Sequence, residues 1–103
     1  MYILVCYVPH SHLEQVKQAL FSAGAGVMGG YDQCCWETEG LGQFRPLQGS
    51  DPFLGKRGEL AQVREWRIEL VVNEEDAPLV VQALKDAHPY EVPAFHLIPV
   101  RTL

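Results

Sequence analysis

The densest group of side chains able to do chemistry lies near the end of the sequence, in the run His88-Pro89-Tyr90-Glu91-Val92-Pro93. Histidine, tyrosine and glutamate can exchange protons or hold a ligand. The two prolines fix the backbone and favour extended geometry in the residues before them. This turn could bind or catalyse, or it could lock a subunit interface with Tyr90 packed and Glu91 hydrogen-bonded. The sequence favours the structural role.

A second group of charged side chains occupies alternate positions, at Glu65, Arg67 and Glu69. In a β-strand these three residues share one face, and the apolar residues between them share the other. We expect this strand to be central in its sheet. If a partner subunit covers the charged face, the charges must be paired, either with one another or with the His88–Glu91 turn.

Four histidines and three cysteines raise the question of a metal site. The candidate ligands are His88, His96 and Cys34, but the sequence has no C-x-x-C or H-E-x-x-H spacing. Cys34 and Cys35 are adjacent, so they would point to opposite faces of a strand. We therefore expect both cysteines to act as small apolar residues. An adventitious or intersubunit divalent metal is the one cofactor that the sequence leaves open.

The run Gly24-Ala25-Gly26-Val27-Met28-Gly29 has the spacing of a dinucleotide-binding loop. That loop follows a strand and opens a helix, whereas here a helix is expected before the glycines and a strand after them. The glycines are therefore interpreted as a helix stop followed by a tight turn.

Glycine and proline are concentrated between residues 40 and 58, where they fill seven of nineteen positions. Average usage is about 7% for glycine and about 5% for proline. This composition predicts a shaped loop. The loop either closes over a ligand or forms a long hairpin extension that packs against a neighbouring subunit.

The elements that would position these residues form two strand–helix–strand units. The first has an apolar strand over 2–8, a helix between the Ser11–Glu14 capping box and Gly24, and a strand over 31–38. Gly40-Leu41-Gly42 would then turn the chain into a short hairpin arm at 43–47. The second unit has a strand over 62–72, a helix capped by Asn73, and a strand over 94–98. Pro78 fits the first turn of that helix, and Pro99 ends the last strand or confines it to an edge.

The two units resemble each other. At an offset of 64 residues, six of the sixteen positions from 8 to 23 are identical. A duplicated unit gives the order β-α-β-β-α-β, which is the ferredoxin-like plan of an α+β fold, with an antiparallel sheet and two helices on one face.

The first strand is apolar on both faces, with Ile3, Val5 and Tyr7 alternating with residues that are also apolar. A strand with one face in water should alternate between apolar and polar residues. The helices can cover only one face. A second copy of the chain is the simplest cover for the other, so we expect a homo-oligomer, either a dimer or a trimer.

Composition restricts the class of protein. The length of 103 residues corresponds to a single domain over 1–103. The net charge of −5 argues against a nucleic-acid partner, since a basic footprint is missing. No apolar run is long enough to cross a membrane, and the first residues lack the features of a secretory signal. An odd number of cysteines, two of them adjacent, predicts a reduced cytoplasmic protein.

Several of these segments together resemble the insert domain of YqfO-type proteins, in the Ngg-interacting-factor (Nif-three) family. The resemblance rests on Gly24–Gly26, Gly29–Cys34 with Tyr31, Gly40–Pro46 with Phe44, the glycines and prolines up to Gly58, the row from Glu65 to Glu69, and Ala87–Glu91. The His88–Pro93 turn alone is also similar to CutA proteins, which are trimeric and linked to divalent-metal tolerance. Cys35, Trp36 and Val92 depart from the expected pattern.

The resemblance implies the PII-like variant of the ferredoxin-like fold and a free-standing version of the insert. In the larger proteins the dinuclear metal centre lies in flanking domains, so their hydrolase-like activity is not carried over to this chain.

The function predicted from the sequence is a non-enzymatic PII/CutA-like module that self-associates. We expect it to bind a small ligand or a protein partner near the 40–58 loop and the 88–91 turn. The alternatives are a divalent-metal-binding protein of the CutA type and a hydrolase-like enzyme. The ligand or interface residues would be His88, Tyr90, Glu91, Glu65, Arg67, Glu69, Tyr31, Cys34 and Phe44, and the metal ligands His88, His96 and Cys34.

Overall fold

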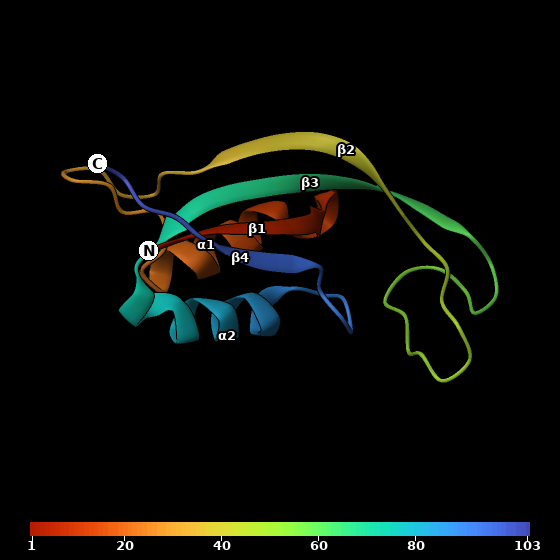
Figure 1. The fold of residues 1–103 in the computed structure, drawn as a ribbon. Coiled ribbons are helices and arrows are strands. Elements are labelled where there is room, and N and C mark those ends of the chain that lie inside the picture. The colour runs from red at the N-terminus through yellow and green to blue at the C-terminus, as the bar shows by residue number, and fades with distance from the viewer.

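A four-stranded antiparallel sheet forms the frame of the molecule, and two helices lie together against one of its faces (Figure 1). The computed structural model describes residues 1–103. The strands are ordered β2-β3-β1-β4 across the sheet. The α+β fold predicted from the sequence is therefore confirmed. The elements, in chain order, are β1 (Tyr2–Pro9), a short helix η1 (His10–His12), α1 (Leu13–Ser22), β2 (Trp36–Phe44), β3 (Ala61–Val72), a short helix η2 (Glu74–Asp76), α2 (Ala77–Ala87) and β4 (Phe95–Pro99).

The core lies between the sheet and the two helices. Alternation along β1 and β3 directs one apolar set of side chains from each strand toward the helices, and each helix supplies an apolar stripe at helical spacing. Cys6 belongs to this core, and burial raises the pKa of its thiol to about 12. The core residues of these four elements are Leu4, Cys6, Val8, Leu13, Val16, Leu20, Ile68, Leu70, Val72, Ala77, Val80 and Leu84.

The opposite face of the sheet carries no helix (Figure 1). Directly paired residues on adjacent antiparallel strands share a face. Val5 pairs with Glu69 on one side and with His96 on the other, and Glu69 also pairs with Trp36. These four side chains therefore project from the same face, which we call the open face. The predicted central position of the strand that carries Glu65, Arg67 and Glu69 is confirmed.

The second strand begins and ends later than the sequence predicts. The expected strand over 31–38 and arm over 43–47 are replaced by one continuous strand, β2, over Trp36–Phe44. Gly40 and Gly42 do not turn the chain; they pair with Glu65 and Val63 of β3. Pairing along a long partner strand overrides the low strand propensity of glycine. The reversal occurs instead within 45–60, and the hairpin extends past the ends of the helices (Figure 1).

The helix ends also differ in part from expectation. The Ser11–Glu14 capping box does not form: α1 begins at Leu13, and the Ser11 hydroxyl lies 2.8 Å from Nδ1 of His12 instead. Asn73 precedes η2 and makes no capping hydrogen bond through its side chain. Gly24 follows the end of α1 with a φ of 109°, so the predicted glycine stop is confirmed. Neither helix is of the length and apolarity that crossing a membrane requires.

One glycine after α1 is required by the packing of the following loop. Gly26 has a φ of 81° and donates its N–H to the carbonyl of Val71. A Cβ atom at this position would lie 2.7 Å from the backbone oxygen of Cys34. Gly30 has nothing within 4 Å of such an atom and no positive φ.

We expect Gly26→Ala to lower the free energy of unfolding by about 2 kcal/mol or more, because the positive φ alone costs about 1–2 kcal/mol in a residue with a Cβ. Gly30→Ala, the matched control, should stay within about 0.5 kcal/mol of the parent protein. Urea unfolding followed by circular dichroism measures both changes. Equal stability of the two variants would contradict the assignment.

Candidate functional site

The turn after α2 is tied to β1 by a buried histidine. His88 is only 5% exposed, and its Nε2 lies 2.7 Å from the carbonyl oxygen of Tyr7. Its Nδ1 accepts the backbone N–H of Tyr90 at 3.1 Å. This pair of bonds assigns the neutral tautomer that carries its proton on Nε2. Burial lowers the pKa of His88, although the bond to Tyr7 opposes that shift. Both ring nitrogens are thus occupied in holding the turn.

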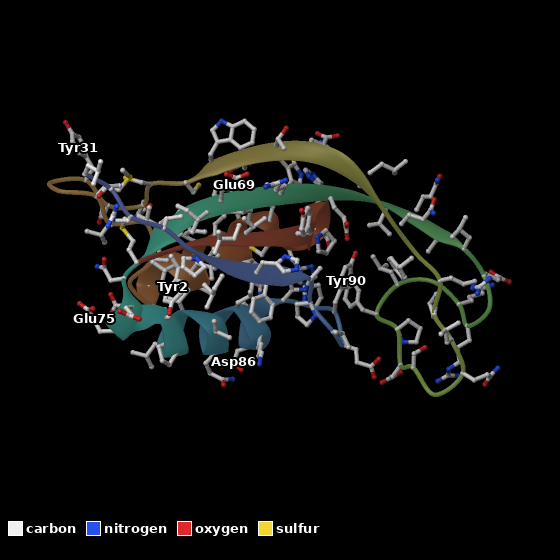
Figure 2. All side chains as sticks on the ribbon, viewed as in Figure 1. Tyr2, Tyr31, Glu69, Glu75, Asp86 and Tyr90 are labelled. Carbon is white, nitrogen blue, oxygen red and sulfur yellow. The ribbon has the colours of Figure 1, made fainter.

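Tyr90 extends the turn toward the sheet. It lies between the sheet and the long loop (Figure 2), and its hydroxyl donates to Oε2 of Glu65 at 2.7 Å. Burial raises the pKa of Tyr90 above its ordinary value, and the hydrogen bond to the Glu65 carboxylate raises it further. Tyr90 is therefore a protonated donor at neutral pH, which holds one oxygen of Glu65 in place.

The position of Glu65 depends on a glycine in the neighbouring strand. A Cβ atom on Gly42 would overlap the Glu65 carboxylate. The sequence pattern assigned Gly42 to a turn, so its role beside Glu65 was missed. A glycine within an otherwise regular strand often marks such a close approach, and that was the available signal.

The long loop packs against the same turn. The carboxylate of Glu91 accepts the backbone N–H of Asp51 at 3.2 Å. The ring of Phe53 lies 6.5 Å from that of Tyr90 and 5.4 Å from that of His12, measured between centroids. The ring of Phe44 lies 5.8 Å from that of Tyr90. The loop therefore bends back over the 88–91 turn of its own chain.

These contacts border an open cavity of about 340 Å³, which we call the loop pocket. It is bordered by the start of the loop, the end of β2 and the turn before β4. Its lining is half apolar, and its charged side chains are Arg45, Glu65 and Glu91. The lining residues are Tyr7, Gln43, Phe44, Arg45, Pro46, Ser50, Pro52, Phe53, Leu54, Glu65, Tyr90, Glu91, Val92 and Ala94.

A smaller cavity of about 210 Å³ adjoins the loop pocket on the open face. Tyr7 and Glu65 line both cavities, and Arg67 lines the smaller one. Arg67 forms an ion pair with Glu69 at 2.8 Å. Within the charged row of β3, Arg67 is therefore paired with Glu69, while Glu65 is hydrogen-bonded to the turn through the hydroxyl of Tyr90.

The remaining predicted site residues lie elsewhere. Tyr31 is at the far end of the molecule from Tyr90 (Figure 2) and is 76% exposed. Cys34 lies in the loop before β2, where its thiol faces the carbonyl of Asp32 at 3.6 Å. His96 projects from the open face on β4. The structure therefore does not bring His88, His96 and Cys34 together, and no cluster of three or more His, Cys, Asp or Glu side chains is placed to hold a metal ion.

Four of the site residues predicted from the sequence line the loop pocket: Phe44, Glu65, Tyr90 and Glu91. The sequence patterns missed Tyr7, Arg45 and Phe53. Tyr7 was assigned only to the open face, and the other two were treated as parts of a loop without individual roles. The contribution of Arg45 and Phe53 arises from how the loop folds back, which no local pattern encodes.

Comparison with known proteins places this geometry in a family context. No protein-family model matches the chain. The chain is 46% identical over 100 residues to the GTP cyclohydrolase 1 type 2 homolog of Halalkalibacterium halodurans, covering 97% of this chain and 27% of that protein. It is 44% identical over 97 residues to the Bacillus subtilis protein of the same name, covering 94% of this chain and 26% of that protein. The chain therefore spans about a quarter of the length of these relatives.

Solved structures show the same relationship as these sequence relatives. A Bacillus cereus protein related to NIF3 superposes with a TM-score of 0.84 at 37% identity, over 98% of this chain and 26% of that one. The PII-like protein CutA from Nostoc superposes with a TM-score of 0.69 at 19% identity, over 97% of this chain and 81% of that one. The second likeness shows the fold alone. The resemblance drawn from the sequence is confirmed: over nearly its whole length, this chain is similar to one segment of the Nif-three (YqfO-type) proteins, and it has the fold of CutA.

Proposed function

We propose that this chain is a non-enzymatic binding module of the PII/CutA-like type, which self-associates through its open face and binds a small ligand in the loop pocket. The observation that carries this proposal is the convergence of β2, the long loop and the 88–94 turn on one cavity of about 340 Å³. Ligand sites in proteins are typically apolar cavities of about 300–1,000 Å³ with a few placed polar groups. Glu65, Tyr90 and Glu91 supply such groups here.

The chemistry of the turn favours binding over catalysis. Both ring nitrogens of His88 are hydrogen-bonded to backbone groups, and His88 does not line the loop pocket. Tyr90 is a hydrogen-bond donor with a raised pKa, so it is a poor base or nucleophile at neutral pH. The activity in the name of the longer relatives belongs to proteins of which this chain spans about a quarter. We therefore assign this chain a binding role.

Apolar exposure supports self-association. Trp36 and Ile98 project from the open face, where they are 60% and 46% exposed in the single chain. Ile98 pairs with Ile3 of β1, so the apolar area continues across the sheet. Among the charged side chains on this face, Arg67 is paired with Glu69, and Glu65 accepts a hydrogen bond from Tyr90. A second or third copy could cover this surface without burying an unpaired arginine.

The proposal needs no metal ion, and it places the protein in the cytoplasm. Because His88, His96 and Cys34 are apart within one chain, a divalent-metal site of the predicted type would need ligands from more than one copy. All three cysteines are free, with Cys6 buried and the other two partly covered. Free thiols fit a reducing compartment.

The association surface is tested by placing charge on it. We expect the parent protein to sediment as a dimer or trimer at micromolar concentration. Trp36→Lys combined with Ile98→Lys should weaken association at least about tenfold, or about 1.4 kcal/mol. Both residues are exposed in the single chain, so the fold should be retained. Leu79→Lys, on the exposed side of α2, is the matched control and should not change the sedimentation coefficient. A parent protein that sediments as a monomer would overturn self-association.

The loop pocket is tested with a neutral apolar probe, 3,3-dimethylbutan-1-ol, followed by nuclear magnetic resonance. We expect the probe to shift amide signals of Phe44, Phe53 and Tyr90. Phe53→Ala should weaken binding about fivefold, because burial of an aromatic contact of this kind is worth about 1 kcal/mol or more. Leu60→Ala removes an exposed side chain of the same loop that does not line the pocket, and should leave the affinity unchanged. Shifts confined to other surfaces would contradict a pocket site.

The role of neutral His88 in holding the turn after α2 is tested through the pH dependence of stability. Because burial lowers the pKa of His88 in the folded state, the unfolded chain takes up a proton first as the pH falls below about 6.5. The stability contributed by neutral His88 is therefore fully present above about pH 6.5 and is lost progressively at lower pH. The loss is at most about 1.4 kcal/mol per pH unit for one proton.

Urea unfolding between pH 5 and pH 7 should show a smaller slope for His88→Gln than for the parent protein. His96→Gln, which removes an exposed histidine, should keep the parent slope. If His88→Gln also keeps it, then His88 is not the linked group.

A further inference from the structure

We propose that the ligand of the loop pocket is a small organic cation with a methylated ammonium group. This inference rests on the proposed binding function and adds the chemical class of the ligand. It is carried by two features of the lining, a carboxylate that no cation neutralises and the aromatic rings beside it.

The carboxylate is that of Glu65. It is partly buried, and its hydrogen-bonding partner is the neutral hydroxyl of Tyr90. None of the ion pairs in the structure includes Glu65. Arg67, two residues away on the same face, is paired with Glu69. A carboxylate removed from water is costly unless a positive charge compensates it. Glu65 therefore has no paired cation, and a ligand could supply one.

Aromatic side chains line the same pocket as this carboxylate. Tyr7, Phe44, Phe53 and Tyr90 all line the loop pocket, and the centroid separations of 5.8 and 6.5 Å place Phe44 and Phe53 on the ring of Tyr90. Aromatic rings attract cations through their negative faces, and sites of this type recognise quaternary and methylated ammonium groups. An apolar stem on the ligand would meet Pro46, Pro52 and Leu54.

The charged side chains that line the pocket argue against an anionic ligand. Glu65 and Glu91 both line the pocket, against the single exposed cation Arg45. Glu91 is also outside every ion pair and accepts only the Asp51 N–H among the polar contacts of its side chain. The net charge of −5 for the whole chain adds a long-range attraction for cations.

The same lining distinguishes a methylated ammonium from a primary one. A primary ammonium carries three N–H donors, each of which needs an acceptor when it is buried. Half of the lining is apolar, and one oxygen of Glu65 is already bonded to Tyr90. A methylated ammonium brings the charge with fewer donors to satisfy. The cavity volume of about 340 Å³ suits a small ligand.

The test compares choline with 3,3-dimethylbutan-1-ol, which replaces the charged nitrogen by carbon at nearly the same shape. Both are titrated into the full chain and followed by nuclear magnetic resonance. We expect choline to bind at least tenfold more tightly than the alcohol, with shifts at Phe44, Phe53 and Tyr90. Glu65→Gln should weaken choline binding at least tenfold and leave the affinity for the alcohol within twofold.

Glu75→Gln makes the same change of charge at the other end of the molecule (Figure 2) and should alter neither affinity. Glu91→Gln, an exposed position, gives a second readout if Glu65→Gln does not fold, and should weaken choline binding about threefold or more.

Each outcome decides a different claim. Equal affinities for choline and the alcohol, or tighter binding of n-butylammonium than of choline, would overturn the ligand class and leave the loop pocket as a binding site. Absence of binding by all three probes would overturn the ligand class together with the proposed ligand site. Choline shifts that are confined to other surfaces would also overturn this inference.

Discussion

The antiparallel register of β3 between β1 and β2 is the constraint on which the rest of the structure depends. Alternation along β3 directs Ile68, Leu70 and Val72 into the core and leaves Glu65, Arg67 and Glu69 on the open face. The same register sets Glu65 opposite Pro9 on one side and Gly40 on the other. A slip by one residue would exchange the two faces, burying the charges and exposing the core. The packing of the helices and the position of the candidate site thus both depend on the register of this one strand.

The turn after α2 is attached to this frame by hydrogen bonds rather than by ion pairs. His88 joins the end of α2 to Tyr7 of β1, and Tyr90 joins the turn to Glu65 of β3. A buried neutral histidine with both nitrogens bonded costs little, whereas an unpaired buried imidazolium would cost much. The polar atoms of His88 and Tyr90, which suggested acid–base chemistry, thus hold the turn on the sheet. His88 does not line the loop pocket, whereas Tyr90 and Glu91 do.

The periodic spacing of apolar residues along strands and helices predicted the fold correctly, whereas the limits of one strand and one helix cap were predicted wrongly. The alternation of β3 and the apolar stripes of both helices predicted the fold, because burial imposes these periods directly. The limits of β2 were wrong, since pairing with β3 carries Gly40 and Gly42 into a strand that their propensity disfavours. The Ser11–Glu14 cap was wrong because Ser11 lies inside the short helix η1 instead of preceding α1 as its cap. The meeting of Phe53 with Tyr90 depends on a loop that folds back over a distant turn, and no spacing in the sequence encodes that contact. The roles proposed for Glu65, Glu91 and Phe44 remain predictions.

The open face and the loop pocket are physically linked, because Tyr7 and Glu65 line both the pocket and the adjoining cavity on that face. Covering the open face with another copy would remove water from the side of Glu65 that the pocket does not enclose. The Coulomb interaction of that carboxylate with any nearby charge would then strengthen, since less solvent screens it. The cost of leaving it without a cation would rise for the same reason. Self-association and cation binding at this position would therefore favour each other without any change in the backbone. Association would strengthen the attraction between Glu65 and a cation, and a bound cation would lower the free-energy cost of covering Glu65.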